Sequence, residues 1–242
     1  MKADKSKYLE TFSKLAKNHT KELNKRMRLL ELFAGSRSIG KEAEKQGFNV
    51  FSVDINNFEN IDLVIDILEL KKEMIPFKPD VIWASPPCTY FSVASIGHHW
   101  HENHTPKSKE ALLGMEILNK TMDIFKWFPD AIFFMENPRG KMRRKVKGLD
   151  RTSVTYCSYA TKETEVITMK PTDIWSNNIY DIFNPNGWKP KPMCFNGNTK
   201  CNHEEAPRGS KTGVQGQKGN YERSKIPKEL CADIIKSTIK ID

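Results

Sequence analysis

Short apolar runs alternate with helix-like segments along the first half of the chain, and this alternation limits the fold more than any other feature. Five runs have the composition of buried strands and two segments between them have helical periodicity: the runs at 28–33, 48–53, 61–67, 79–84 and 131–135, and the segments at 39–46 and 111–128. Apolar strands separated by helices are typical of parallel sheets that are covered on both faces. The sequence therefore predicts an α/β fold with a doubly wound, mostly parallel sheet.

The remaining segments are expected to surround that sheet. The chain has 242 residues, enough for one sizeable α/β domain and a minor lobe. Apolar side chains recur at helical spacing within residues 1–27, which predicts a helix packed on the core. Residues 28–175 form the main domain. Residues 176–222 are rich in Asn, Gly, Pro and Lys and predict a small loop-rich lobe, and residues 223–242 contain a helix that returns to the core.

Composition narrows the expected compartment and partner. No apolar run reaches the roughly 20 residues of a membrane-spanning helix, and the N-terminus lacks the apolar stretch of a secretory signal. The five cysteines are widely spaced and odd in number, so they predict free thiols in a reducing cytoplasm rather than a disulfide framework. A formal net charge of +9 favours a polyanionic partner, because Lys and Arg release counterions when they neutralise phosphates.

Residues suited to chemistry gather where the predicted strands end. They are Gly35, Asp54, Asp66, Cys88 and Glu136. Ligands of open α/β sheets bind beyond the carboxyl ends of the strands. We therefore expect one site along this edge of the sheet.

The segment Glu31–Ser38 predicts a sharp turn from strand to helix at Gly35. Backbone N–H groups at such a turn, together with the gap left by a small residue, can accommodate a cofactor. Asp54 ends the next strand, where an acid can bind ribose hydroxyls. Arg37 stands where a second glycine would complete a nucleotide-binding pattern, so an ordinary structural turn remains the alternative.

Two further segments carry candidate catalytic groups. Ser85–Ser92 places Cys88 directly after two prolines, which fix the backbone and can direct the thiol as a nucleophile. Phe133–Gly140 places Glu136 at the end of an apolar strand, where burial raises the pKa of a carboxyl group and suits it to proton transfer. The alternatives are a buried structural cysteine and a solvated acid at a strand end.

In this order and spacing, the three segments resemble the motifs of the cytosine-5 DNA methyltransferases. Three matches carry the resemblance: Phe33 and Gly35 in the cofactor turn, Pro87-Cys88 in the nucleophile motif, and Glu136-Asn137 in the acid motif. The likeness is greatest to small, phage-type members, which tend to have Ser-Pro-Pro-Cys and Glu-Asn-Pro. It covers residues 29 to 138 and continues more weakly through 156–159 and 170–175.

The resemblance implies a Rossmann-like methyltransferase that uses S-adenosylmethionine, with a catalytic domain at 28–175 and a target-recognition lobe at 176–222. Cys88 would add to carbon 6 of a cytosine flipped out of duplex DNA. Glu136 would hold or protonate ring nitrogen 3, carbon 5 would take the methyl group, and elimination would release Cys88. Asp54 would bind the ribose of the cofactor and Asp66 its adenine amino group.

The implied site residues fall into three groups. The catalytic residues are Cys88, Glu136, Pro87 and Asn137. The cofactor-binding residues are Phe33, Ala34, Gly35, Ser36, Ser38, Asp54, Ile55, Asp66, Ile67, Ser85 and Pro86. The DNA-binding candidates are Ser92, His98, His99, Trp100, Arg139, Lys141, Arg143, Arg144 and Lys162. We further expect a cytoplasmic monomer, in a bacterial or phage-infected cell, of the kind found in phages or restriction-modification systems.

The sequence departs from the family pattern at two places. Arg37 replaces a glycine, where it would either crowd or bind the carboxylate of the cofactor. The Arg-x-Arg that family members carry after a later strand is not evident, and Lys162 is the nearest cationic candidate.

A metal site is expected in the loop-rich lobe, where Cys194, Cys201 and His203 lie close in sequence. Sulfur and nitrogen ligands favour zinc, and a lobe with a small apolar core gains stability from a metal. Cys157 or another residue would have to supply a fourth ligand, and unrelated polar loop residues are the alternative. The histidines of residues 98–104 are expected to contact DNA rather than metal.

Two other functions remain open at this point. Amino-group DNA methyltransferases place an aromatic residue after Pro-Pro, where this chain has Cys88, although Tyr90 is close by. A DNA-binding relative that has lost catalysis is the second alternative.

Overall fold

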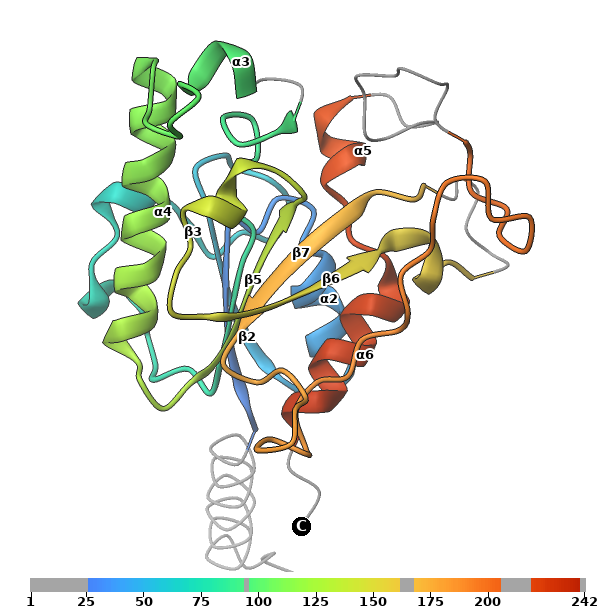
Figure 1. Ribbon diagram of the computed structural model, residues 1–242. Helices are drawn as coiled ribbons and strands as arrows, with labels where there is room; N and C mark the ends of the chain where they lie inside the picture. Colours follow the sequence, from blue (N-terminus) through green and yellow to red (C-terminus); the bar gives the residue numbers. More distant parts are fainter. Residues whose placement is uncertain (1–25, 94–95, 162–167, 206–218, 240–242) are drawn as a thin grey trace, which may run out of the picture.

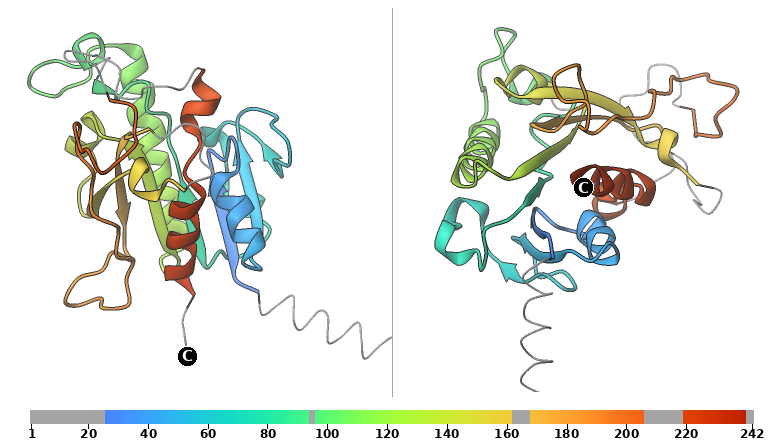
Figure 2. Two further views of the ribbon diagram at one scale, coloured as in Figure 1. Left: turned by 90° about the vertical axis from the view of Figure 1, so that its right-hand side faces the viewer. Right: turned by 90° about the horizontal axis from the view of Figure 1, so that it is seen from below.

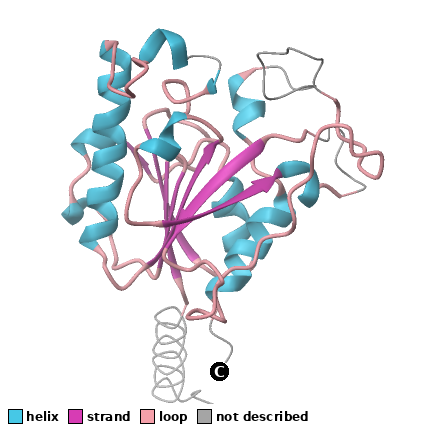
Figure 3. Ribbon diagram, in the orientation of Figure 1, coloured by secondary structure: helices cyan, strands magenta, loops and turns pink. Residues whose placement is uncertain are grey.

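The computed structural model describes residues 26–93, 96–161, 168–205 and 219–239. The predicted N-terminal helix falls almost wholly outside these ranges, as does Lys162. A sheet of seven strands forms the centre of the described fold, with helices on both sides (Figure 1, Figure 3).

The elements follow the alternation expected from the apolar runs. The strands are β1 (Arg28–Leu32), β2 (Asn49–Asp54), β3 (Leu63–Val64), β4 (Val81–Ala84), β5 (Ile132–Pro138), β6 (Asp150–Thr155) and β7 (Pro171–Ser176). The α-helices are α2 (Ser38–Lys45), α3 (Ile96–His99), α4 (Lys109–Trp127), α5 (Asn220–Ser224) and α6 (Lys228–Thr238). Short 3-10 helices cover Ile67–Glu69, Lys72–Met74, Lys141–Arg144 and Tyr156–Tyr159.

The strand order is β3-β2-β1-β4-β5-β7-β6. Strands β1 to β5 pair in parallel, whereas β7 runs antiparallel to both of its neighbours, β5 and β6. The order reverses on either side of β1, as in other doubly wound sheets, and such a switch point opens a crevice at the carboxyl ends of the strands. The predicted fold class, a doubly wound and mostly parallel sheet, is confirmed.

Two apolar cores, one on each face, hold the helices to the sheet. One core joins the sheet to α4 through residues such as Leu118, Ile124 and Phe125. The other joins it to α2 and α6 through residues such as Ile39 and Ile234. Figure 2 shows α4 on the opposite side of the sheet from α2 and α6. The sheet is therefore covered on both faces, which explains the nearly continuous apolar composition of its parallel strands.

The C-terminal segment lies against this second core. Helix α6 packs on α2, and the backbone N–H of Ile226 donates a hydrogen bond to Ser38 Oγ at 3.2 Å. Trp188, which is 1% exposed, donates from Nε1 to Asp233 Oδ2 at 2.9 Å and so joins the segment after β7 to α6. Among the described residues, no helix is both long enough and apolar enough to cross a membrane.

Each predicted strand differs from its expected bounds by at least one residue, and two of the differences have a clear physical cause. The strand expected at 61–67 is only Leu63–Val64, because Asp66 caps the following 3-10 helix by accepting a hydrogen bond from the Leu68 N–H at 2.9 Å. Strand β5 continues past Met135 to Pro138, because β7 pairs with its last residues, including Glu136 with Ile174. Glu136 therefore lies inside a strand rather than just after one.

Candidate active site

The acid candidate lies on β5, and the nucleophile candidate lies in the loop that leaves the adjacent strand β4. Strands β4 and β5 pair with Ala84 opposite Met135, so this loop starts at the level of Glu136. The Asn137 amide donates from Nδ2 to the Pro86 carbonyl at 2.7 Å. This hydrogen bond ties the proline-rich loop to β5, and it gives Asn137 a structural role in joining the two motifs.

The loop around Cys88 is anchored at both ends. Before the cysteine, Trp83 donates from Nε1 to Ser85 Oγ at 2.8 Å, and Pro86 is buried. After it, the Phe91 N–H donates to the Cys88 carbonyl at 2.9 Å. The thiol itself is partly exposed. A partly exposed thiol on a fixed loop can meet a substrate without rearrangement of the backbone.

One acidic and one cationic side chain, those of Glu136 and Lys170, act on the charge of Cys88. Burial raises the pKa of the Cys88 thiol above its usual range, the charge of Glu136 raises it further, and the charge of Lys170 lowers it. Glu136 is 5% exposed and accepts a hydrogen bond from the Tyr156 hydroxyl at 3.0 Å. A protonated thiol is therefore expected in the free protein at neutral pH, so activation requires a change when substrate binds.

Lys170 and Tyr156 were missed as site residues by the sequence analysis, although both lie in segments that carry the weaker part of the resemblance. Lys170 is 6% exposed, with its Nζ 4.5 Å from the centroid of the Tyr156 ring and 2.8 Å from the Arg223 carbonyl that accepts its hydrogen bond. Its φ of +26° is unusual for a residue with a side chain. Lys170 directly precedes β7, and the pairing of β7 beside β5 brings it within electrostatic reach of Cys88.

The turn after β1 holds three residues in left-handed backbone conformations. They are Phe33, Gly35 and Arg37, with φ values of +57°, +50° and +55°. The Gly35 N–H donates to Asp54 Oδ2 at 2.9 Å, which links the ends of β1 and β2. A side chain added at Gly35 would meet only the Phe33 carbonyl, at 3.9 Å, so the space beside this glycine is open.

The chain provides a further set of groups that fit a nucleoside-containing cofactor beside this turn. Ile55 is 62% exposed directly after β2 and offers an apolar surface to a planar base. Asp66, also exposed, offers a carboxylate one strand away. The implied cofactor residues Ala34, Ser36 and Ile67 have buried side chains, so their contribution would come from the backbone. Ser36 and Ser38 hydrogen-bond to each other through their hydroxyls at 2.8 Å.

Arg37 neither crowds nor lines this space. Its side chain is buried behind the turn, where Nε donates to Ser52 Oγ at 2.9 Å and the guanidinium pairs with Glu31 and Glu44. Arg37 was expected either to crowd or to bind the carboxylate of the cofactor. Neither expectation fits the structure, because its side chain turns away from the edge of the sheet. It keeps the left-handed conformation that glycine would have and adds a buried ion pair under the turn.

The candidate DNA-binding residues differ in how much surface they offer. Trp100 is 3% exposed, its ring lies tilted against that of Phe91, and its Nε1 donates to the Tyr90 carbonyl. Trp100 is therefore a core residue, and its side chain does not offer the surface that the expected contact with DNA requires. Lys141 is 6% exposed and within 2.8 Å of His104 Nδ1.

Other members of that set lie closer to solvent. Arg143 pairs with the buried carboxylate of Asp173. His98, Arg139 and Arg144 are exposed, His99 bonds to Ser108, and Ser92 lies in a bridge with Gly140.

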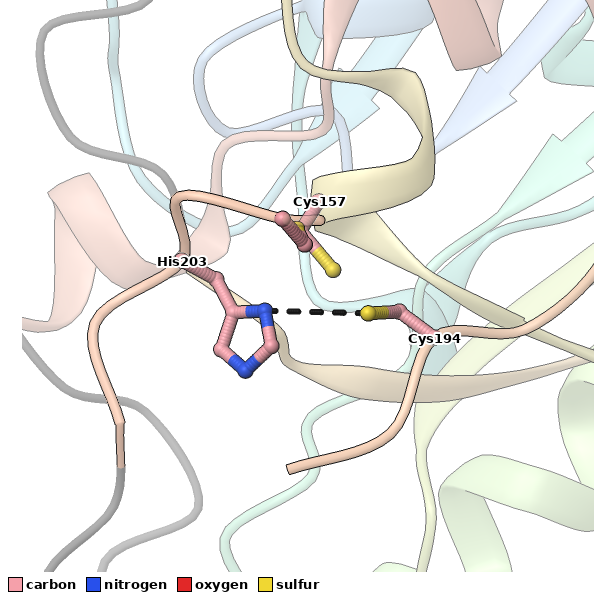
Figure 4. Close-up of side chains that lie close together, drawn as sticks. Cys157, Cys194 and His203 are labelled. Atoms are coloured by element: carbon pink, nitrogen blue, oxygen red, sulfur yellow. Dashed lines mark hydrogen bonds between the residues drawn. The ribbon is translucent and has the colours of Figure 1, made fainter. Parts of the chain in front are cut away.

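A second group of chemically active residues lies beyond the C-terminal end of β6. Cys157, Cys194, Cys201 and His203 each offer one ligand atom, and these atoms lie within 4.8 Å of one another. Figure 4 shows the sulfur atoms of Cys157 and Cys194 and the ring of His203 around a common space. The structure thus brings together the three residues that the sequence singled out and Cys157, the residue named as a candidate for the fourth ligand.

One comparison with known proteins agrees with the motifs, whereas no protein-family model matches the chain. The chain is 29% identical over 227 residues to a protein of Frog virus 3 (isolate Goorha) named "Probable DNA (cytosine-5)-methyltransferase", and the match covers 86% of this chain and 99% of the viral one.

Solved structures with similar folds are more distant. A proposed DNA modification methyltransferase encoded within an E. coli prophage has a TM-score of 0.45 and 17% identity, with 69% of this chain and 52% of that one covered. Spodoptera frugiperda DNMT2 has a TM-score of 0.41 and 18% identity, with 62% and 49% covered. The chain spans about half the length of both proteins.

The sheet order, with the candidate site at the ends of its strands, defines a doubly wound, Rossmann-like fold. The name of the viral relative supports the resemblance of the motifs to those of the cytosine-5 DNA methyltransferases.

Proposed function

We propose that the chain is a DNA methyltransferase that transfers a methyl group to carbon 5 of cytosine. The observation that carries this proposal is the pair formed by Cys88, in the loop after β4, and Glu136, on the neighbouring strand β5, close enough for the charge of Glu136 to raise the pKa of the thiol. The viral relative bears the name of the same activity over nearly its whole length.

Cys88 acts as the nucleophile of the reaction. The thiol gives its proton to solvent, Sγ forms a bond to carbon 6 of the cytosine ring, and the electron pair of the double bond between carbons 5 and 6 moves toward carbon 5. The base must first leave the stack, which costs a few kcal/mol. Burial and the charge of Glu136 raise the pKa of this thiol in the free protein, which suppresses its reaction with other electrophiles.

Glu136 manages the charge that develops on the ring. Its Oε1 accepts from the Tyr156 hydroxyl, which leaves Oε2 to hold or protonate ring nitrogen 3. Lys170, stacked on Tyr156, supplies positive charge to the same buried space and lowers the pKa of Cys88. Lys170 therefore favours the thiolate, whereas Glu136 and Tyr156 stabilise the charge that develops on the ring.

S-adenosylmethionine supplies an electrophilic methyl group on a sulfonium when it is bound. The turn at Gly35 and the carboxylate of Asp54 fit its amino-acid and ribose portions, and Ile55 and Asp66 fit its adenine. After transfer, the carbon 5 proton is removed by a base and the bond from Cys88 to carbon 6 breaks, which restores the thiol.

The substrate in this proposal is duplex DNA, bound by a monomer. The formal charge of +9 and the exposed Arg139 and Arg144, which follow Glu136 in sequence, support binding to phosphates. Packing disfavours an amino-group methyltransferase that would use Tyr90. The Tyr90 ring lies edge-on to His99 and against Gly114 of α4, where an added Cβ would come within 3.0 Å of Tyr90 Cδ2.

We also propose that the loop-rich lobe binds one structural zinc ion through Cys194, Cys201 and His203. The support is the chemistry of the ligands, because two thiols and an imidazole in close proximity favour zinc.

The experiment that tests the main proposal is transfer of a labelled methyl group to duplex DNA, followed by nucleoside analysis, for the wild type and for Cys88→Ala. We expect 5-methylcytosine with the wild type and none with the variant. N4-methylcytosine or N6-methyladenine as product would contradict the proposed target atom. Binding of DNA without any transfer would favour a relative that has lost catalysis.

A further inference from the structure

The four residues of this cluster, three of which are drawn in Figure 4, come from two segments that are far apart in sequence. Cys157 lies in the 3-10 helix Tyr156–Tyr159, directly after β6, whereas Cys194, Cys201 and His203 lie in a stretch after β7. That stretch, residues 189–205, contains no helix or strand. We refer to it as the 189–205 loop. A ligand held by all four residues would therefore join the loop to the sheet.

The spacing of the ligand atoms suits a tetrahedral zinc ion. With Zn–S near 2.3 Å and Zn–N near 2.05 Å, a sulfur and a nitrogen on adjacent corners lie about 3.6 Å apart. The separation between Cys194 Sγ and His203 Nδ1 is 3.7 Å. All four atoms lie within 4.8 Å of one another, so small side-chain rotations bring them to one centre.

The burial of His203 is unexplained without a ligand. The residue is 6% exposed, and its Nε2 has no hydrogen-bond partner among the described residues. Its Nδ1 lies within hydrogen-bonding distance of the thiol of Cys194, which is a weak partner. A buried imidazole is costly unless its polar atoms are bonded, and coordination through Nδ1 would satisfy the atom that faces the sulfurs.

The surroundings resemble the outer shell of a metal site. The Asn198 amide donates from Nδ2 to Cys194 Sγ at 3.1 Å, and the Cys201 N–H donates to the Asn198 carbonyl at 3.0 Å. A donor aimed at a sulfur stabilises a thiolate, which is the form that binds metal. All five cysteines of the chain are free, so no disulfide competes for these sulfurs in the structure.

Polar contacts already position the loop against the Tyr156–Tyr159 helix. The Cys194 N–H donates to Thr155 Oγ1 at 2.7 Å, Ser158 Oγ donates to the Pro192 carbonyl at 2.9 Å, and the Lys191 N–H donates to the Tyr159 hydroxyl at 2.7 Å. Apolar packing contributes little here, since Phe195 is 65% exposed. Hydrogen bonds of this kind contribute modestly in water, so the loop needs a stronger attachment.

We propose that Cys157, Cys194, Cys201 and His203 form a Cys3His zinc site that clamps the 189–205 loop onto the catalytic sheet. Four protein ligands fill the tetrahedron, so the ion is structural and holds no water or substrate. Binding releases the three thiol protons to solvent and leaves a site with a net charge of −1. In the part that rests on the proposed function, the clamp also fixes Tyr156, the neighbour of Cys157, against Glu136.

Metal content tests the site independently of activity. We would purify the full chain under reducing conditions and measure zinc per chain by mass spectrometry. We expect one equivalent in the wild type and in the matched control Cys231→Ser, which alters a buried thiol of α6 outside the cluster. Cys157→Ser and His203→Ala should each lose most of the metal. Full zinc in Cys157→Ser, or none in the wild type, would overturn the proposal.

A second measurement covers the case in which these variants fail to fold. Cobalt added to the chelated wild type should give the visible d–d bands of a tetrahedral ion and a thiolate-to-metal charge-transfer band. Alkylation followed by peptide mapping should show Cys157, Cys194 and Cys201 protected by zinc and exposed by a chelator. Equal alkylation with and without zinc would contradict the site. A disulfide between two of the three in reduced protein would do so as well.

The link to catalysis has its own arms. Cys88→Ser should keep one zinc and lose methyl transfer, which separates a failure of the proposed function from a failure of the metal site. Chelation of the wild type should lower the rate of transfer at least tenfold, and added zinc should restore it. If transfer is unchanged after the zinc has left, the clamp does not support Tyr156 and that part of the proposal is wrong.

Discussion

The two halves of the sheet are held together by different means. In the half formed by β1 to β4, the central parallel strands β1 and β4 are almost wholly buried, and the turn at Gly35 is shaped by backbone geometry and by a buried ion pair. In the half formed by β5, β6 and β7, the residues next to the site meet through side-chain hydrogen bonds, a cation over a ring and a cluster of thiols. The first half suits a rigid cofactor site, and the second suits a site that responds to substrate.

The largest expected effect is on the rate of methyl transfer and concerns Glu136, in the half of the sheet formed by β5, β6 and β7. Glu136→Gln keeps the size of the side chain and removes its charge, so it should lower kcat by about 10²–10⁴-fold, the usual contribution of a positioned acid or base. Cofactor affinity should change little, because Gly35 and Asp54 lie on other strands. Single-turnover kinetics and cofactor titration measure the two quantities. Glu110→Gln, an exposed change in the first turn of α4, is the control.

The next effect tests the buried ion pair of the first half. Burial raises the pKa of Glu31 to about 7, with Gly40, Ser52 and Arg37 opposing the shift. The folded state then binds more protons than the unfolded state between the ordinary pKa of the acid and about 7, so this group makes stability fall as pH rises through that window.

Glu31→Gln removes the titration while it keeps an acceptor for the Gly40 N–H. The free energy of unfolding of the variant relative to the wild type should therefore rise from pH 4.5 to pH 7, by at most about 3 kcal/mol. Urea denaturation at a series of pH values measures it. A constant difference would show that Glu31 is ionised throughout.

A smaller effect concerns the cation of the second half. Lys170→Met removes the positive charge that lowers the pKa of Cys88, so the pH profile for alkylation of that thiol should move to higher pH. Peptide mapping isolates the rate at Cys88 from the other cysteines. Lys191→Met is the matched control, since Lys191 also lies over a tyrosine ring, that of Tyr159, but does not affect the Cys88 thiol. An equal shift in both variants would contradict a specific role for Lys170.

The smallest effect lies at the surface. Arg139→Ala and Arg144→Ala should each weaken DNA binding about equally at all sequences and reduce the salt dependence by about one phosphate contact. Lys126→Ala, in the last turn of α4, should leave both unchanged. Fluorescence anisotropy at several salt concentrations measures the slopes. A loss confined to one DNA sequence would mean that these arginines read bases.

The same contrast explains what could be predicted from sequence. The parallel strands and their end residues Gly35, Asp54 and Cys88 followed from apolar runs and turn chemistry, because each run is buried whatever its neighbours are. The positions of Lys170 and Cys157 depend on which strand β7 and β6 pair with, and local pattern does not contain that information. The sequence showed that Arg37 stands where a glycine is expected, and the structure gives it the left-handed backbone of a glycine. The direction of its side chain depends on Glu31 and Ser52, which local pattern does not reveal.

The place of β7 between β5 and β6 has a consequence for synthesis of the protein on the ribosome. The strand that pairs with Glu136 is the last of the sheet in sequence, so β5 emerges with one edge unpaired and waits for residues up to Ser176. An unpaired apolar edge is a template for association with other chains. Nascent chains that stall before β7 should therefore aggregate or recruit chaperones. Chains that have released Ser176 from the ribosome should already have all seven strands of the sheet paired.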